Sequence, residues 1–339
     1  MTLLVRDEAD IVDAQIAFHL DAGIDFVIAT DNRSQDGTTD VLERYEREGH
    51  LHLIREPGDD LRQSEWVTRM AALAATDFDA DWVLNTDADE FWLPRGGDFR
   101  ALFATIPQRF GAIRGAWRNY VPRPDDDRFF AERMTARLCA PQFHPHPLST
   151  HFKTAHRAVA DVRVGRGNHE AFGSGLVALR GWYPIEIHHF PVRSLEHCLR
   201  KYVTQFVALE RNAEKGIPGH MAEAYAAYRA GRLEEFYAPL VVDDGQLARE
   251  LEEGTLAVDT RVRDRLRALG FGHTGGAEPA GVPLPTPEED AAYAGEYSVL
   301  GEADLGLAYG ERVAHVERRL ADIQRSPLAR LGARVGIAS

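Results

Sequence analysis

The stretch that decides the fold is WVLNTDADEF, residues 82–91. It begins with an apolar run, Trp82 to Leu84, that is typical of a buried strand. Two carboxylates, Asp87 and Asp89, follow where such a strand ends. They can share a hard divalent cation or one of its bound waters, because Mg²⁺ and Mn²⁺ prefer oxygen ligands. An acidic turn exposed to solvent is the alternative interpretation of this pattern.

Strands and helices alternate on the N-terminal side of this stretch. Apolar runs occur at 3–5, 26–29 and 51–54, and helical patterns follow them from about residues 10, 38 and 61. On the C-terminal side, further strands are expected at 112–117 and around 157–164, 176–180 and 185–190, and a helical pattern at 195–237. Strands that alternate with single helices predict an α/β fold, with a mainly parallel sheet flanked by helices.

Polar segments follow three of the four N-terminal strands. They are RDE at 6–8, DNRSQDG at 31–37 and NTDADE at 85–90. In open parallel sheets, ligands bind beyond the carboxyl ends of the strands. Carboxylates gathered at one edge repel each other unless a cation or a donor-rich ligand lies between them. A bound Mg²⁺ or Mn²⁺ would there stabilise the charge that develops on a diphosphate leaving group.

The order of these motifs resembles that of family 2-type glycosyltransferases. The bacterial branch reads R/N-E-A-D, then D-N-x-S-x-D-G-T, then D-x-D-E-F, and this chain has RDEAD from Arg6, DNRSQDGT from Asp31 and DADEF from Asp87. The resemblance covers about residues 1–210 and implies a GT-A fold, a nucleotide-diphospho-sugar donor, a divalent metal and inversion at the sugar carbon. Arg6 departs from the Asn of many relatives, and RSQ at 33–35 from the usual Gly/Asn-Ser-Thr/Ser.

The same resemblance implies a nucleotide pocket in the first half. It maps Asp31 onto the carboxylate that accepts a hydrogen bond from the imide N–H of the base, and capping of the next turn is the alternative. Glu8 is expected to hold the ribose or to order its loop. Gln63 is expected near the nucleotide, or on the solvated surface. A UDP-sugar is the favoured donor, with GDP- and dTDP-sugars as alternatives.

Five basic residues of the second half are candidates for the diphosphate contact. They are Lys153, Arg157, Arg193, Arg200 and Lys201. Cations at these positions would neutralise phosphate oxygens. The alternative is that they are exposed basic side chains without a ligand.

An inverting transfer also needs a group that accepts the proton of the attacking hydroxyl. Glu170 is the predicted general base and His169 its helper or substitute, because glycines on both sides would place them on a bent, accessible loop. An ordinary polar hairpin loop is the alternative. The strand at 185–190 alternates, so His188 and His189 face opposite sides. His189 is the predicted third metal ligand beside Asp87 and Asp89, and a packed histidine is the alternative.

Composition excludes several classes of protein. The 39 Lys and Arg against 53 Asp and Glu give a net charge of −14, which argues against nucleic-acid binding. No apolar run is long enough to span a membrane, and the N-terminal residues turn acidic too early for a signal peptide. Two cysteines are too few for a disulfide scaffold. A cytoplasmic location is therefore expected.

Together these observations predict a metal-dependent, inverting glycosyltransferase of the hexosyltransferase type, acting on a saccharide or small-molecule hydroxyl. A nucleotidyltransferase, a nucleotide-sugar hydrolase and a non-catalytic nucleotide-sugar-binding domain are the alternatives. The GT-A domain is expected at 1–210, with a nucleotide-binding half at 1–95 and an acceptor half at 96–210. A helical C-terminal extension is expected at 211–339, with a Gly/Pro-rich linker at 272–288, and it could cover the acceptor cleft or make a homo-oligomer contact.

Overall fold

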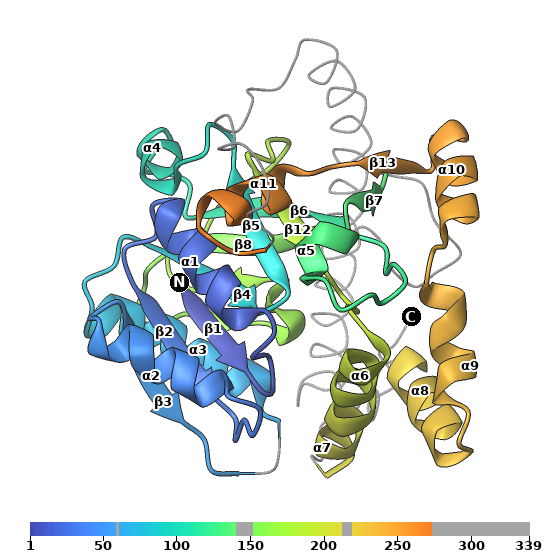
Figure 1. Ribbon diagram of the computed structural model, residues 1–339. Helices are drawn as coiled ribbons and strands as arrows, with labels where there is room; N and C mark the ends of the chain where they lie inside the picture. The colour runs from blue at the N-terminus through green and yellow to red at the C-terminus, as the bar shows by residue number, and fades with distance from the viewer. Residues whose placement is uncertain (59–60, 140–151, 212–218, 273–339) are drawn as a thin grey trace, which may run out of the picture. The chain divides into compact units, whose positions relative to one another are not determined.

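Strands and helices alternate through the first 87 residues, in the order that the sequence predicts (Figure 1). The computed structural model describes residues 1–58, 61–139, 152–211 and 219–272. The strands are β1 (Thr2–Val5), β2 (Val27–Asp31), β3 (Leu51–Arg55) and β4 (Trp82–Asp87). The helices between them are α1 (Val12–Asp21), α2 (Thr38–Arg47) and α3 (Gln63–Thr76). Gly37, before α2, has φ +100°, a left-handed conformation that suits glycine.

The described residues form a nine-stranded sheet that is mainly parallel. Its order is β3-β2-β1-β4-β8-β6-β12-β5, and β11 pairs with β6 beside this path. The added strands are β5 (Glu90–Pro94), β6 (Ala112–Asn119), β8 (Phe152–Arg157), β11 (Ala178–Leu179) and β12 (Ile185–His189). Pairs β4–β8, β8–β6 and β12–β5 are antiparallel, and all others in this sheet are parallel.

The sheet curls because only two residues separate the end of β4 from the start of β5, yet β5 pairs with β12 at the far end of the strand order. Only Ala88 and Asp89 lie between Asp87 and Glu90, so the end of β4 stays next to the edge strand. In this register Glu90 is opposite His189, which in turn is opposite Asn119 of β6. The curl therefore gathers the carboxyl ends of β1, β4, β6 and β12.

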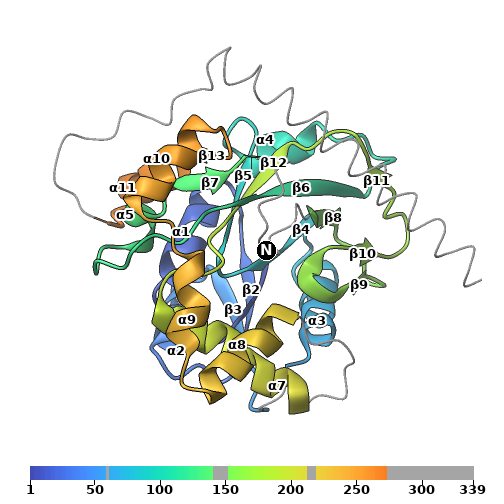
Figure 2. The ribbon, with the colours of Figure 1, turned by 90° about the vertical axis from the view of Figure 1, so that its right-hand side faces the viewer.

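Helices cover both faces of the parallel part of the sheet. Figure 2 shows α3 on one side of β2 and β3, and α2 on the other. The α3 side is packed with Val67, Met70 and Val83. The core on the other side includes Phe18 and Trp92, both fully buried. These two apolar layers confirm the predicted α/β class, with a mainly parallel sheet flanked by helices.

Short helices and strands complete the fold. The helices are α4 (Phe99–Ala104), α5 (Phe130–Arg133), η1 (Arg166–Asn168), α6 (Leu195–Cys198), η2 (Leu199–Thr204), α7 (Gln205–Arg211), α8 (Gly219–Arg229), α9 (Leu233–Tyr237), η3 (Ala238–Leu240), α10 (Asp244–Glu252) and α11 (Arg261–Ala268). The strands β9 (Arg163–Val164) and β10 (Ala171–Phe172) pair with each other, as do β7 (Ala136–Leu138) and β13 (Leu256–Val258). The segment η2 is a π-helical turn, a form often found at functional sites.

The C-terminal segment of the described chain is mainly helical, as predicted. The described residues belong to one compact unit, Met1–Thr286, and the second unit, Pro287–Ser339, lies outside them. The Gly/Pro-rich linker after Gly272 also lies outside the described residues, as do residues 310–324, where apolar residues at helical spacing predict a helix. The predicted boundary at residue 210 stays a prediction. Within the described ranges, every helix is too short or too polar to cross a membrane.

Candidate active site

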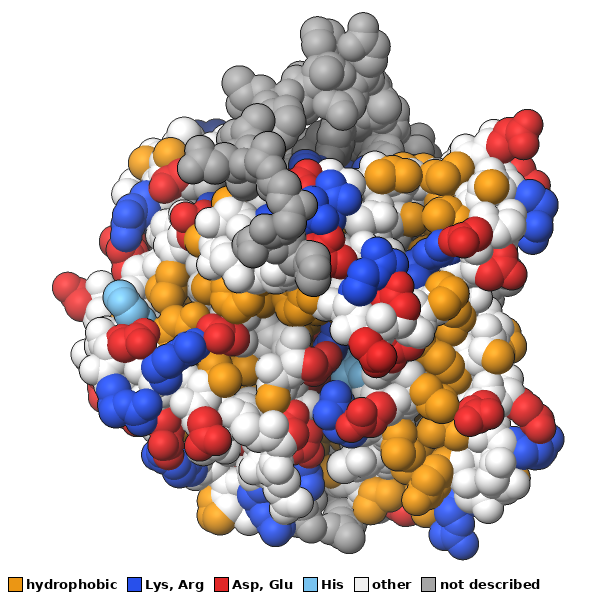
Figure 3. Space-filling view, in the orientation of Figure 1, with side chains coloured by type: hydrophobic (Ala, Val, Ile, Leu, Met, Phe, Trp, Pro, Cys, Tyr) orange, Lys and Arg blue, Asp and Glu red, His pale blue; other side chains and the backbone are white. Residues whose placement is uncertain are grey.

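A cavity of about 530 Å³ lies at the carboxyl ends of the gathered strands. Asp87, Ala88 and Asp89 form part of its wall, together with Glu8 after β1 and His189 at the end of β12. Residues of the segments η2 and α7 also line it. Figure 3 shows acidic and basic side chains interspersed on one face of the molecule. The candidate site is therefore identified by the cavity and not by a patch of one charge on this face.

Asp87 is held by a buried lysine. Lys153 Nζ lies 2.5 Å from Asp87 Oδ2 and 2.6 Å from Glu90 Oε1, and the side chains of Lys153 and Glu90 are both fully buried. Burial raises the pKa of Glu90 to about 7, although Lys153 acts in the opposite direction. The second oxygen of Asp87, Oδ1, accepts a hydrogen bond from Asn168 Nδ2 at 3.1 Å. Both oxygens of Asp87 are thus engaged within the protein.

Asp89 faces a histidine and a second lysine. Its Oδ2 lies 3.3 Å from His189 Nε2 and accepts a hydrogen bond from Lys201 Nζ. Burial would raise the pKa of this carboxyl, but the charge of Lys201 outweighs it and holds the pKa well below its usual value. Burial also lowers the pKa of His189, so its ring is neutral near pH 7. Asp89 therefore meets the cavity as a carboxylate.

Arg193 anchors the acidic N-terminal motif under the cavity. It is buried, its Nη2 lies 2.5 Å from Glu8 Oε2, and its Nε lies 2.7 Å from Asp10 Oδ2. Burial would raise the pKa of Glu8, but Arg193 and His197 lower it on balance. Arg193 does not line the cavity, whereas Glu8 and His197 do. Its contacts thus fix Glu8 in place and argue against a phosphate contact from Arg193 itself.

The loop after β9 brings His169, but not Glu170, to the cavity wall. His169 Nδ1 lies 2.8 Å from the carbonyl oxygen of Phe152, which fixes the ring. A Cβ at Gly167 would lie only 2.7 Å from His169 Nε2, so glycine makes room for this ring. Burial lowers the pKa of His169 and keeps it neutral. Gln63 also lines the cavity, and its Oε1 accepts a hydrogen bond from Gly167 N at 3.2 Å.

Asp31 and the basic residues of β8 lie outside the cavity wall. Both oxygens of Asp31 accept bonds in its own loop, from Ser34 N at 2.9 Å and Thr39 Oγ1 at 2.5 Å. This is the capping alternative, and the base contact stays a prediction. Arg157 donates to the carbonyl oxygens of Phe110 and Ile106, away from the cavity. Of the predicted phosphate ligands, Arg200 and Lys201 line the described cavity, whereas Lys153, Arg157 and Arg193 do not.

Of the three predicted metal ligands, the side chains of Asp89 and His189 face each other, whereas Asp87 is engaged by Lys153 and Asn168. In the described part of the chain, no group of three or more His, Cys, Asp or Glu side chains is arranged to hold a metal ion. His189 Nδ1 lies 2.7 Å from Asn119 Oδ1. With the proton on Nδ1, the lone pair of Nε2 faces Asp89, which is how metal-binding histidines are oriented. Oxygens of a diphosphate, or waters, would supply the other ligands of a divalent cation bound beside Asp89 and His189.

The side chains of this site that were not among the predicted residues include Trp117, Asn119 and Asn168. The Trp117 ring stacks on His189 with centroids 4.2 Å apart. Trp117 Nε1 also donates to Glu90 Oε1 at 3.1 Å. Trp117 and Asn119 lie two residues apart on β6, so strand alternation alone places them on one face. No comparable local signal marks Asn168, whose role depends on the fold of its loop.

Comparison with protein families supports one class of enzyme for the N-terminal part. The model of glycosyltransferase family 92 matches residues 4–106, less than a third of the chain. This match agrees with the expected class, although the predicted family was family 2. The matched residues extend from β1 through α4 and include Asp87 and Asp89. Among curated proteins, none matches the sequence.

The solved structures that resemble this one include TarS of S. aureus. Its residues 1–349 in complex with UDP-GlcNAc share 11% identity, with 90% of each chain covered and a TM-score of 0.33. The complex with UDP shares 11% identity, with 67% of this chain and 69% of that chain covered and a TM-score of 0.31. These TM-scores are too low to establish a shared fold, so the fold description rests on the topology given above.

Proposed function

We propose that this chain is a glycosyltransferase that moves a hexosyl group from a nucleotide-diphospho-sugar to a hydroxyl acceptor. The observation that carries the proposal is the convergence of His189 and Lys201 on Asp89 at the cavity. His189 Nε2 lies 3.3 Å from Asp89 Oδ2, and Lys201 Nζ donates a hydrogen bond to the same oxygen. The family match over residues 4–106 supports the class. UDP is the favoured nucleotide, and inversion the favoured outcome.

In this proposal, the residues around Asp89 bind the diphosphate of the donor. Asp89 and His189 would hold a divalent cation, Mn²⁺ or Mg²⁺, which when bound supplies positive charge against the departing diphosphate. The ammonium group of Lys201 pairs with Asp89 at the cavity wall. When the cation and the donor bind, this group turns from Asp89 to a phosphate oxygen, with which it forms a charge-assisted hydrogen bond. Glu8, fixed by Arg193, contacts the ribose hydroxyls.

The transfer itself forms one bond and breaks another. The acceptor oxygen bonds to the anomeric carbon, the bond from that carbon to the diphosphate oxygen breaks, and the nucleoside diphosphate leaves with the electron pair. The hydroxyl proton passes to His169, which is neutral and lines the cavity. His169 is preferred to Glu170 for this role because the side chain of Glu170 is not part of the cavity wall.

Product analysis tests the proposal. The protein is incubated with Mn²⁺ and UDP-, GDP- or dTDP-sugars, with and without a panel of saccharide and small-molecule hydroxyl acceptors. The expected result is nucleotide release that depends on one acceptor and matches a glycosylated product mole for mole. Release of free sugar without acceptor would instead indicate a hydrolase, and release of sugar 1-phosphate with transfer of the nucleotidyl group a nucleotidyltransferase. Either result would overturn the proposed transfer.

A further inference from the structure

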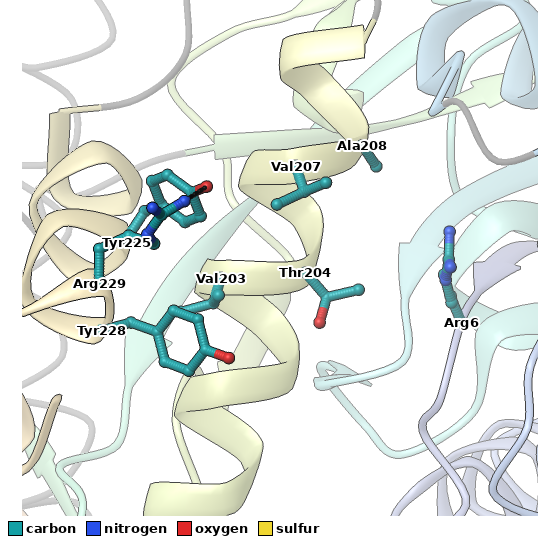
Figure 4. A pocket seen from close by; sticks show the side chains of 8 residues that line it. All are labelled: Arg6, Val203, Thr204, Val207, Ala208, Tyr225, Tyr228 and Arg229. Atoms are coloured by element: carbon teal, nitrogen blue, oxygen red, sulfur yellow. Dashed lines mark hydrogen bonds between the residues drawn. The ribbon is translucent and has the colours of Figure 1, made fainter. Parts of the chain in front are cut away.

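A second cavity, of about 670 Å³, adjoins the first. Arg6, Thr204 and Ala208 line both cavities, so the two share a wall. Figure 4 shows the side chains of this second cavity: two tyrosines and an arginine on α8, Val203 and Val207 on the facing helix, and Arg6 beyond that helix. A molecule bound here can extend past Thr204 toward Asp89.

The aromatic side chains of this cavity are held by neighbours on one side. The ring of Tyr225 stacks on Phe206 with centroids 4.3 Å apart, and its hydroxyl oxygen accepts a hydrogen bond from Arg229 Nη1 at 3.4 Å. Tyr228 is 46% exposed, a large exposure for an aromatic residue. An aromatic ring with one open face and few rotatable bonds packs well against the C–H face of a sugar ring. The tyrosines therefore favour a ligand that contains rings.

The charge of this cavity is opposite to that of the whole chain. Arg6 and Arg229 are among the residues that line it, and none of the described lining residues is acidic. The chain as a whole carries a net charge of −14. A positive cavity on an acidic protein selects ligands with a negative group, because guanidinium groups pair with carboxylate and phosphate oxygens.

We propose that this second cavity is the acceptor site, and that the acceptor is an anionic saccharide, one with a carboxylate or phosphate group beside its sugar ring. The proposal rests on the proposed glycosyl transfer. Tyr228 packs against the ring, Arg229 pairs with the anionic group, and the shared wall at Thr204 directs the reacting hydroxyl into the donor cavity.

Ligand-observed NMR on the full chain, with UDP and diamagnetic Mg²⁺ present, tests the site. The probes are methyl glucuronide, its neutral counterpart methyl glucoside, and glucose 6-phosphate. The variants are Tyr228→Ala and Arg229→Gln. The matched control is Arg232→Gln, because Arg232 is an exposed arginine just after α8 that pairs with Glu235 and does not line the cavity. Unfolding midpoints of all variants are measured to confirm that they fold.

The expected result is about tenfold tighter binding of the two anionic probes than of methyl glucoside. Arg229→Gln should remove this preference, Tyr228→Ala should weaken all three probes, and Arg232→Gln should change nothing. Equal binding of glucuronide and glucoside, no binding of any probe, or an unchanged preference in Arg229→Gln would overturn the acceptor site. UDP binding measured in the same samples separates the acceptor-site proposal from the proposed glycosyl transfer. If UDP does not bind, the result counts against the donor cavity and not against the site for the anionic probes.

Discussion

Replacing Lys153 with methionine should destabilise the protein in a way that depends on pH. Lys153 is fully buried and forms the one ion pair that is described for Glu90, at 2.6 Å. Lys153 also pairs with Asp87, whose side chain is partly exposed. Removing one partner of a buried ion pair costs about 3–5 kcal/mol, since the other charge is left uncompensated. Asp87 can be rehydrated, but Glu90 cannot. The hydrogen bonds that Trp117 Nε1 and Trp92 Nε1 donate to Glu90 offset part of this cost, and Glu90 can lower the rest by taking up a proton.

The direction of the pH dependence follows from the pKa of Glu90. Burial has raised this pKa from 4.5 to about 7 in the folded protein, and the loss of Lys153 will raise it further. At pH values between the unfolded-state pKa of 4.5 and the raised pKa of the folded state, the folded protein holds more protons than the unfolded chain. The free energy of unfolding therefore falls as pH rises through this range. The slope approaches about 1.4 kcal/mol per pH unit for one proton. The loss in Lys153→Met should therefore be small near pH 6 and reach the full amount near pH 8 to 9.

Urea unfolding followed by circular dichroism at several pH values measures this effect. Arg55→Met is the matched control: Arg55 lies 2.6 Å from Glu43, but both are exposed, and such pairs contribute about 0–1 kcal/mol. In the double variant Lys153→Met with Glu90→Gln, the pH dependence should disappear. A loss in Lys153→Met that is the same at every pH, or no larger than that of Arg55→Met, would refute the reasoning about Glu90.

Three further predictions concern the site and its support. His169→Gln should lower kcat by about two to four powers of ten with little change in donor KM, whereas the adjacent Glu170→Gln should be nearly silent; steady-state kinetics that give the reverse order would return the base to Glu170. Gly115→Ala should cost about 1–3 kcal/mol in urea unfolding, because its Cβ would lie 2.8 Å from Ile187 Cδ1; an unchanged midpoint would mean that β12 moves freely. Arg193→Met should weaken UDP binding through Glu8 as well as lower stability, and calorimetry showing unchanged affinity would remove Glu8 from the ribose contact.

The alternation of strands and helices was predictable from the sequence because it is a local pattern. Runs such as Trp82 to Leu84 are buried on both faces in a parallel sheet, so apolar runs of this kind mark the strands directly. The strand β8 was less evident, since the sequence placed a strand at 157–164 and the structure places it at Phe152–Arg157. Its inward-facing positions include Lys153, a charge that hides the apolar pattern until its partners are known.

The site was predictable where residues follow strands, and not where partners come from afar. Asp87, Asp89 and His189 stand at strand ends, so topology alone brings them to one edge. Each carboxylate pairs with a lysine that is distant in the sequence: Asp87 with Lys153, 66 residues away, and Asp89 with Lys201, 112 residues away. No local pattern encodes such pairs. For the same reason, a local reading could not distinguish His169, at the cavity wall, from Glu170 beside it.

The central claim is that Asp89 belongs to a cation-assisted diphosphate site, and calorimetry of UDP binding tests it most directly. Wild type, Asp89→Asn and the exposed control Asp25→Asn are titrated with UDP, with and without Mn²⁺. The account predicts that Mn²⁺ tightens UDP binding at least tenfold in wild type and in Asp25→Asn, and that Asp89→Asn loses this gain while unfolding at a similar midpoint. UDP binding that is equally tight with and without Mn²⁺, or unchanged in Asp89→Asn, would contradict it.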